Sequence, residues 1–408
     1  MKVEIAFDLN ANGVGPFFTL DDPVKGLLNS VEFILAGADV LVDVTDTVRQ
    51  VSIQRGRNRQ LEKFTAGNAN IVLDNRDRIY DPLNTASPYF GSIVPRKQVT
   101  ISDFGVTIYT GQVADWNFDY QVSGDSTAQV SCVDGLTLLV DPILTAGTGT
   151  AELTGTRVNK VLTDAGWPFA KRDISVGQAT LDADVIVADS VTALEYLNKI
   201  SISEPGALFV GASGNLIFRD RVDLQNASGN MVFGTGGIAF DNISVEYGIE
   251  EMANFVSLTY YSGAAIGGTV TASDLASIEA YGIFDPNNGG SYNTLLGSSE
   301  DAQVLANWLV SLYAQPQYRI DQVGMNLGSM SVSDQERVLA LELGDVATVT
   351  WTPNNVGDVL SQTVSIDAIE FSASPSGRRI GFTMSQTQAA LVLDDLLVGI
   401  LNTNRLGF

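Results

Sequence analysis

Apolar and polar residues alternate in several short runs through the first part of the chain. The runs cover residues 3–7, 40–44, 51–53, 69–73 and 128–133. A period of two is typical of a β-strand that buries one face. Many short strands with turns between them predict a sandwich or a barrel, which we place at residues 1–145.

Two helices are expected after this first domain, because the composition changes to small residues and the apolar spacing lengthens. Thr156 begins the first helix, whose apolar residues recur every three or four positions, and Gly166 ends it. In the second helix, Thr192 and Glu195 have the spacing of a capping box.

A β-hairpin is predicted to follow these helices and to pack on one of them. Its strands are residues 207–210 and 216–219, which completes a small α+β domain at residues 146–242. The turn between the strands comes close to a nucleophile elbow around Ser213, but Asn215 stands where the last glycine belongs. A hairpin turn explains these residues better.

Strand-like alternation returns in residues 243–385, which we predict to be a second β-barrel-like domain with one amphipathic helix. Ser299 is expected to cap that helix, and acidic residues occupy its first turn. Its apolar stripe is formed by Leu305, Trp308, Leu309 and Leu312. Further strands are expected at residues 346–351, 364–371 and 379–384.

The last segment, residues 386–408, is largely apolar, but Asp394 and Asp395 interrupt it and argue against a membrane span. The same Leu-Asp-Asp motif occurs near the N-terminus at Asp21 and Asp22. The two segments also share a glycine, a leucine and an asparagine in register. Either each makes the same contact with its own β body, or the similarity of two short loops is due to chance.

Charge and length limit the classes of protein that the chain can belong to. It has 408 residues and a net charge of −24, yet only 17% of its residues are charged, against roughly 25% in an ordinary globular protein. Nine of the 23 basic residues lie between Arg49 and Lys97, interleaved with acidic ones. Internal ion pairs are therefore favoured over a nucleic-acid surface.

The sequence contains no histidine, and Cys132 is its only cysteine. An intrachain disulfide, the Ser-His-Asp and Cys-His nucleophile systems and nearly all structural zinc sites are thereby excluded. Cys132 falls on the apolar rhythm of a strand and is expected to be buried. The N-terminus lacks the profile of a signal peptide, and no apolar run reaches roughly 20 residues, so we expect a soluble protein made in the cytoplasm.

Two groups of carboxylates are candidate chemical sites. Residues 74–81 resemble the start of a calcium loop but lack its glycine and distal glutamate, so arginine-paired carboxylates are the favoured interpretation. Glu204, Glu250 and Glu251 are the candidates for glycoside cleavage, and a solvated strand or turn position is the alternative for each. No metal or cofactor is expected.

A series of motifs resembles a known family. In order, they are an Arg-Gly-Arg at residues 55–57, an Ala-Gly-x-Ala at 66–69, a strand ending Asp-Asn-x-Asp at 74–77, and an Asx-Pro loop at 81–82. This block is similar to the N-terminal part of minor tail proteins of long-tailed, siphovirus-type bacteriophages, particularly those of actinobacterial hosts. The similarity continues to the ending at residues 393–408 and covers almost the whole chain. A Pro-Arg-Lys replaces the more usual Pro-Gly-Arg turn at residues 95–97.

The resemblance implies a baseplate hub protein that is mainly β with an α+β insertion. Such a hub is a homotrimer at the virion tail tip, in which two barrels per subunit form a pseudo-sixfold ring around the DNA channel. The implied partners are the distal tail ring protein, the tape-measure protein and other tail-tip or receptor-binding proteins, and phage DNA passes without specific binding. We expect no enzymatic activity. The expected interface or framework residues are Arg55, Arg57, Asp74, Asp77, Asp21, Asp22, Asp394, Asp395, Leu396, Leu401 and Phe408.

Two other functions remain open on the sequence. The first is a tail-tip cell-wall hydrolase, against which the missing histidine and the lack of a nucleophile motif count. The second is a receptor-binding tail protein, for which the Gly-, Ser- and Asn-rich residues 262–298 are the candidate surface.

Overall fold

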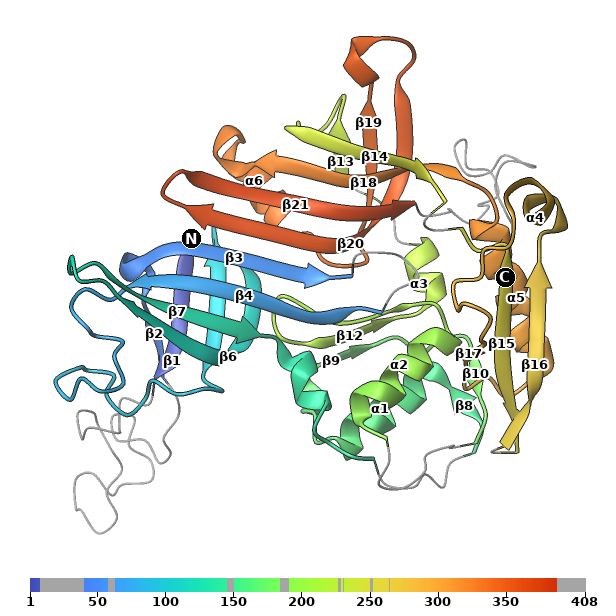
Figure 1. Cartoon of the computed structure of the whole chain (residues 1–408), viewed down its shortest axis with the longest axis horizontal. Coiled ribbons are helices and arrows are strands. Elements are labelled where there is room, and N and C mark those ends of the chain that lie inside the picture. Colours follow the sequence, from blue (N-terminus) through green and yellow to red (C-terminus); the bar gives the residue numbers. More distant parts are fainter. Residues whose placement is uncertain are drawn as a thin grey trace.

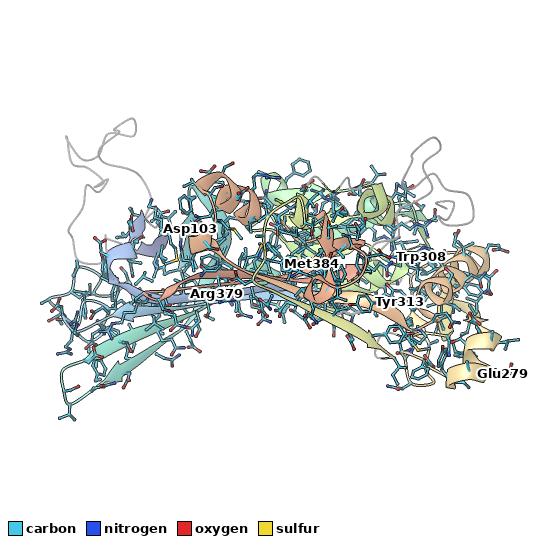
Figure 2. The ribbon with its side chains drawn as sticks, turned by 90° about the horizontal axis from the view of Figure 1, so that it is seen from above. Asp103, Glu279, Trp308, Tyr313, Arg379 and Met384 are labelled. Carbon is cyan, nitrogen blue, oxygen red and sulfur yellow. The ribbon has the colours of Figure 1, made fainter. Side chains whose placement is uncertain are left out.

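The structure is a computed structural model that describes residues 1–7, 40–57, 63–144, 150–183, 191–226, 229, 231–249, 252–263 and 265–386. The molecule is elongated, with the N-terminal strands toward one end and a helix and hairpin from residues 255–313 at the other (Figure 1). Figure 2, seen from above, places Asp103 toward the first end and Glu279 at the second.

The first β half consists of strands β1 to β7. They are β1 (Lys2–Phe7), β2 (Val40–Asp43), β3 (Val48–Gly56), β4 (Thr65–Asp74), β5 (Gln98–Asp103), β6 (Val106–Tyr120) and β7 (Ser126–Val133). Their order in the sheet is β3-β4-β7-β6-β5-β1-β2, and neighbouring strands are antiparallel. Ile71 and Leu73 of β4 are buried and alternate with partly exposed residues, so the predicted strand pattern is confirmed.

The second β half consists of strands β13, β14 and β18 to β21. They are β13 (Met231–Gly234), β14 (Asn242–Gly248), β18 (Gln317–Asn326), β19 (Val346–Trp351), β20 (Leu360–Ser374) and β21 (Gly377–Gln386). The order is β14-β18-β21-β20-β19-β13, and only the β19–β13 pair is parallel. Helix α6 (Val332–Leu339) connects β18 to β19. The strands predicted at residues 346–351, 364–371 and 379–384 are confirmed.

The two β halves have the same connectivity. The order β3-β4-β7-β6-β5 corresponds to β14-β18-β21-β20-β19, and in both halves the strands follow the chain in the same sequence. The long strands β6 and β20 each shift register once against the next strand, between Val113 and Asp115 in β6 and between Ile366 and Ala368 in β20. Each half is therefore a version of one β unit.

Strand β20 joins the halves, because its second part pairs with β3. The strands of the two halves consequently form one 13-stranded sheet, whose path among the described residues runs from β14 to β2, and one hydrophobic core extends through both halves. In Figure 1, β20 in red lies directly beside β3 in blue. The predicted fold class, mainly β with an α+β insertion, is confirmed. Two β-barrel-like domains were predicted, and the two β halves share one sheet because an edge of each half is hydrogen-bonded to the other.

The α+β insertion packs below the sheet in Figure 1 and has its own core. Its helices are α1 (Thr154–Asp164), α2 (Ala193–Ser203) and α3 (Arg221–Asn226), and its strands are β8 (Glu152–Leu153), β9 (Arg172–Ile174), β10 (Thr180–Leu181), β11 (Ala207–Val210) and β12 (Leu216–Arg219). The capping box of Thr192 and Glu195 and the β11–β12 hairpin are confirmed. Helix α1 begins at Thr154, two residues before the predicted start.

A second insertion lies between β14 and β18. It contains β15 (Phe255–Ser262), β16 (Ala265–Ser273), α4 (Leu275–Tyr281), β17 (Tyr292–Asn293) and α5 (Ser299–Tyr313), and α5 packs on the β15–β16 hairpin around a third core. The predicted apolar stripe of α5 is confirmed, but Ser298 rather than Ser299 caps it, by accepting a hydrogen bond from Asp301 N. Residues 243–385, where one helix was predicted, thus contain α4, α5 and α6.

Candidate functional site

The Arg-Gly-Arg motif lies at the end of β3, where the two β halves meet. In this junction Gly56 is opposite Ala368, and the pairing continues in antiparallel register to Val51 opposite Ala373. The first two residues of the motif therefore belong to the strand pair that joins the halves, and Arg57 follows directly on it. Its three residues make three different contacts across the junction.

Arg57 forms a buried ion pair with Asp367 of β20. Its Nε and Nη2 atoms lie 2.8 and 2.7 Å from Asp367 Oδ1, and its backbone N–H donates to the Asp367 carbonyl oxygen at 2.9 Å. The guanidinium also lies over the ring of Phe64, 4.4 Å from its centroid. Asp367 is only 2% exposed, so its charge depends on Arg57 for compensation.

Gly56 is required for the close approach of the two strands. Its φ of +113° is a conformation that residues with a side chain rarely adopt, and a Cβ atom here would lie 2.1 Å from the Asp367 carbonyl oxygen. The glycine between the two arginines therefore allows β3 to reach β20.

Arg55 connects the β halves with the α+β insertion. Its side chain is 4% exposed, and Nη2 donates to the Val210 carbonyl oxygen at 3.1 Å and to Glu342 Oε1 at 2.6 Å. The other carboxylate oxygen of Glu342 accepts from Ala212 N at 2.7 Å. Three regions that are distant in sequence thus meet at one guanidinium group.

The Ala-Gly-x-Ala motif lies beside this site, because Gly67 faces Asp134. Gly67 N donates to Asp134 Oδ2 at 2.6 Å, and the Asp134 N–H donates back to the Gly67 carbonyl oxygen at 2.8 Å. Asp134 also caps the short helix η2 (Gly135–Leu139) by accepting from Leu136 N. Burial raises the pKa of Asp134 to about 6, although these N–H donors and nearby Arg55 act in the opposite direction.

The Asp-Asn-x-Asp motif forms a second group of ion pairs at the end of β4. Asp74 accepts hydrogen bonds from Arg76 and lies 3.2 Å from Arg49 Nη2, while Arg49 also pairs with Asp125 at 2.6 Å. Hydrogen bonds from the Arg76 side chain are the main cause that lowers the pKa of Asp74 to about 2. Asp77 is exposed.

The following loop confirms that its carboxylates are paired with arginine. Arg78 donates to Asp81 Oδ2 through Nε at 2.8 Å and Nη2 at 2.6 Å, and Leu83 N donates to Asp81 Oδ1. Asn75 is fully buried and accepts from Tyr80 N. Among the described residues, no group of three or more acidic, cysteine or histidine side chains could hold a metal ion.

The remaining sequence candidates divide into buried and undescribed residues. Glu204 is 1% exposed and accepts hydrogen bonds from Gln178 N, Ala179 N and the Thr154 hydroxyl, which leaves it no open side toward a substrate. Cys132 is buried as predicted, and burial raises the pKa of its thiol to about 12. The candidates outside the described residues are Asp21, Asp22, Glu250, Glu251, Asp394, Asp395, Leu396, Leu401 and Phe408.

Sequence reasoning missed three residues of the junction: Asp367, Glu342 and Asp103. Asp103 is 1% exposed and forms an ion pair with Arg378 of β21, which adds another link between the halves. Asp367 could have been found, because it is the one charged residue within the apolar run 364–369 and a buried charge requires a partner. Nothing in the sequence indicates which arginine that partner is.

Comparison with known proteins places this fold among phage tail proteins. No family model matches the chain, and no curated protein matches its sequence. Its fold is similar to that of the 43 kDa tail protein of prophage MuSo2 from Shewanella oneidensis, with 14% identity, a TM-score of 0.54, and coverage of 86% of this chain and 95% of that chain. A tail protein from Neisseria meningitidis has 11% identity, a TM-score of 0.55, and coverage of 87% of this chain and 95% of that chain. The chain thus has the fold of a phage tail protein, as the sequence motifs predicted.

No helix in the described part of the chain is long and apolar enough to cross a membrane.

Proposed function

We propose that this chain is a structural protein of a bacteriophage tail tip, where it forms the central hub of the baseplate. The observation that carries the proposal is the fold similarity to two tail proteins, one of them from a prophage, which extends over nearly their whole length. The motif series at residues 55–82 supports it independently, since its motifs take part in the framework of this fold.

The duplicated β unit supports assembly as a trimer. A chain with two equivalent β halves presents two similar surfaces, so three copies can surround an axis with six similar units. Such a ring matches a sixfold tail ring on one side and a threefold bundle on the other. The proposed partners are accordingly the distal tail ring protein and the tape-measure protein, with other tail-tip proteins on the host-facing side.

The charge of the chain agrees with a channel for DNA. The net charge of −24 repels a polyanion, so DNA would pass an acidic wall without binding to it. Near the junction, the buried carboxylates of Asp134 and Asp367 hold backbone or arginine groups in place. We therefore assign these carboxylates to the framework of the hub.

Immunogold electron microscopy of phage particles tests this function. Antibody against the chain is expected to label the tail end distal to the capsid, and light scattering of the purified chain is expected to give three times its mass. Label along the whole tail tube, or absence of the chain from particles, would overturn the proposal. Release of sugar or peptide from purified host cell walls by the chain would instead favour the hydrolase.

A further inference from the structure

The correspondence between the two β halves extends to individual residues. The two halves can be aligned residue by residue at the register shifts, so that Val113 of β6 matches Ile366 of β20. In this alignment, Ile71 and Leu73 of β4 correspond to Val323 and Met325 of β18, and all four side chains are fully buried. The strand ends also agree. Asp74 accepts a hydrogen bond from Arg76 N, and its counterpart Asn326 accepts one from Gly328 N.

The same superposition assigns counterparts to the strands that join the halves. Strand β14 corresponds to β3, with Gly248 in the place of Gly56, and the second part of β6 corresponds to the second part of β20. Within the chain, β3 pairs with β20. In the described part of the structure, β14 pairs only with β18, and the second part of β6 pairs only with β7.

The free edge of β6 has backbone groups that point outward. Along an antiparallel strand, every second residue bonds to the neighbouring strand. Since Gln121 N donates to the Asp125 carbonyl oxygen, β6 bonds to β7 through its odd-numbered residues after the register shift. The N–H and C=O groups of Trp116, Phe118 and Tyr120 therefore face away from β7. Among the described residues, no backbone hydrogen bond to these groups is present from the outer side.

Strand β14 has a free edge of the same kind. On β18, Ile320 N and the Tyr318 carbonyl oxygen bond to the side chain of Gln362, so both face away from β14. Their partners across the ladder, Val245 and Tyr247, therefore also direct their N–H and C=O groups outward. Among the described residues, both edges present a row of backbone groups without a backbone partner, and such edges readily add another strand.

We propose that β14 of one copy of this chain adds to the second part of β6 in the next copy, and that this repeats the internal β3–β20 junction. The inference rests on the trimer of the proposed function and names its interface. If the corresponding strands keep the register of the β3–β20 pairing, Tyr247 lies opposite Trp116, Val245 opposite Phe118 and Ile243 opposite Tyr120. The contact joins two different surfaces of the chain, which is the kind of contact that builds a ring when successive copies are related by a closed rotation.

The side chains on these edges fit the pairing. Tyr247 is 71% and Tyr120 is 50% exposed in the single chain, so both side chains are accessible to a partner strand. Trp116, Phe118 and Tyr120 form a stacked row with ring centroids 6.3 and 6.4 Å apart, against which the aliphatic and aromatic residues of β14 would pack. Phe118 even corresponds to Phe371, which contacts β3 in the internal junction.

The polar positions agree as well. In the internal junction, Gln54 is opposite Glu370 and Ser52 is opposite Ser372. In the proposed interface, Glu246 is opposite Asn117, which is again an amide and a carboxylate. Ser244 is opposite Asp119, so no two like charges face each other.

Disulfide trapping tests the interface and its register. Asn117 and Glu246 form a non-hydrogen-bonded pair in the proposed register, with Cα atoms about 4.5 Å apart, a separation that a disulfide can span. The double variant Asn117→Cys/Glu246→Cys is oxidised and analysed on a nonreducing gel. The matched control, Asn117→Cys/Ser244→Cys, has its cysteines about 7–8 Å apart across the same interface. Native Cys132 is buried and is present in both variants.

We expect the first variant to give disulfide-linked dimers and trimers that reduction converts to single chains, and the control to give at least tenfold less. Light scattering of the unoxidised protein is measured in parallel. A trimer that does not cross-link at this pair would overturn the interface and leave the hub proposal standing. Equal cross-linking of the control would overturn the register, and a protein that stays monomeric at high concentration would overturn both the interface and the trimeric hub.

Discussion

Replacement of Asp367 by alanine is the most direct test of the junction between the β halves. The substitution leaves the Arg57 guanidinium, which is 11% exposed, without the carboxylate that its Nε and Nη2 contact. Breaking a buried ion pair by removing one partner costs about 3–5 kcal/mol. The ring of Phe64 retains its contact with the guanidinium, which offsets about 0.5–1 kcal/mol of that cost.

Hydrogen exchange measured by mass spectrometry is the appropriate assay, because the chain contains several cores and need not unfold in one step. A loss of about 3 kcal/mol corresponds to roughly a hundredfold faster opening at equilibrium. Peptides from β3 and β20 should therefore exchange about a hundredfold faster in Asp367→Ala, while peptides from α5 should be unchanged.

A double variant separates the ion pair from the backbone contact. Arg57→Met/Asp367→Ala removes both charges and should restore exchange at β3 to within about tenfold of the wild type, since two apolar residues leave no buried charge. Arg76→Ala is the surface control: its side chain is 63% exposed, and the loss of its pair with Asp74 should cost less than about 1 kcal/mol. If Asp367→Ala changes exchange no more than this control does, the junction is not held by the ion pair.

Three further substitutions have defined outcomes. Gly56→Ala should destabilise the junction by about 2–4 kcal/mol, through its φ of +113° and the contact with a carbonyl oxygen; unchanged exchange in β3 would contradict this. Glu342→Ala should cost about 2–4 kcal/mol, because buried Arg55 loses its counter-ion, and a thermal shift below 1 °C would refute it. Burial raises the pKa of Asp134 from its unfolded value of 3.8 to about 6, so the protonated carboxyl group is the form that favours folding. This contribution to stability is complete below pH 3.8 and is lost as the pH rises through about 6. Between pH 4 and pH 7, wild-type protein should therefore lose about 2–2.5 kcal/mol relative to Asp134→Asn in urea unfolding, and a difference that does not vary with pH would refute this assignment.

Local patterns predicted most of the elements but not how they are joined. The alternation around Ile71 and the capping box at Thr192 depend on residues close in sequence, and both are confirmed. The β3–β20 pairing joins residues about 310 positions apart, as the Arg57–Asp367 pair does, and alternation specifies a buried face but not the neighbouring strand. The sequence could single out Arg55 and Arg57 because both belong to one short motif, in which they lie two positions apart. Asp367 stands out as a charge in an apolar run, but only the folded chain shows that Arg57 is its partner and that Glu342 pairs with Arg55.

The proposed ring must distinguish β3 from β14, because both strands fit the same kind of edge. The ion pair provides this distinction: if β14 paired with β20, it would place Ile249 where Arg57 lies and leave the Asp367 carboxylate buried without a counter-ion. On the β6 edge the counterpart of Asp367 is Ala114, which an isoleucine can cover and which offers an arginine no partner. The internal junction would thus be specified by charge and the junction between copies by apolar contact. This division also explains why Ile249 and Tyr247 are exposed in a single chain, since they would be covered only when the next copy is present.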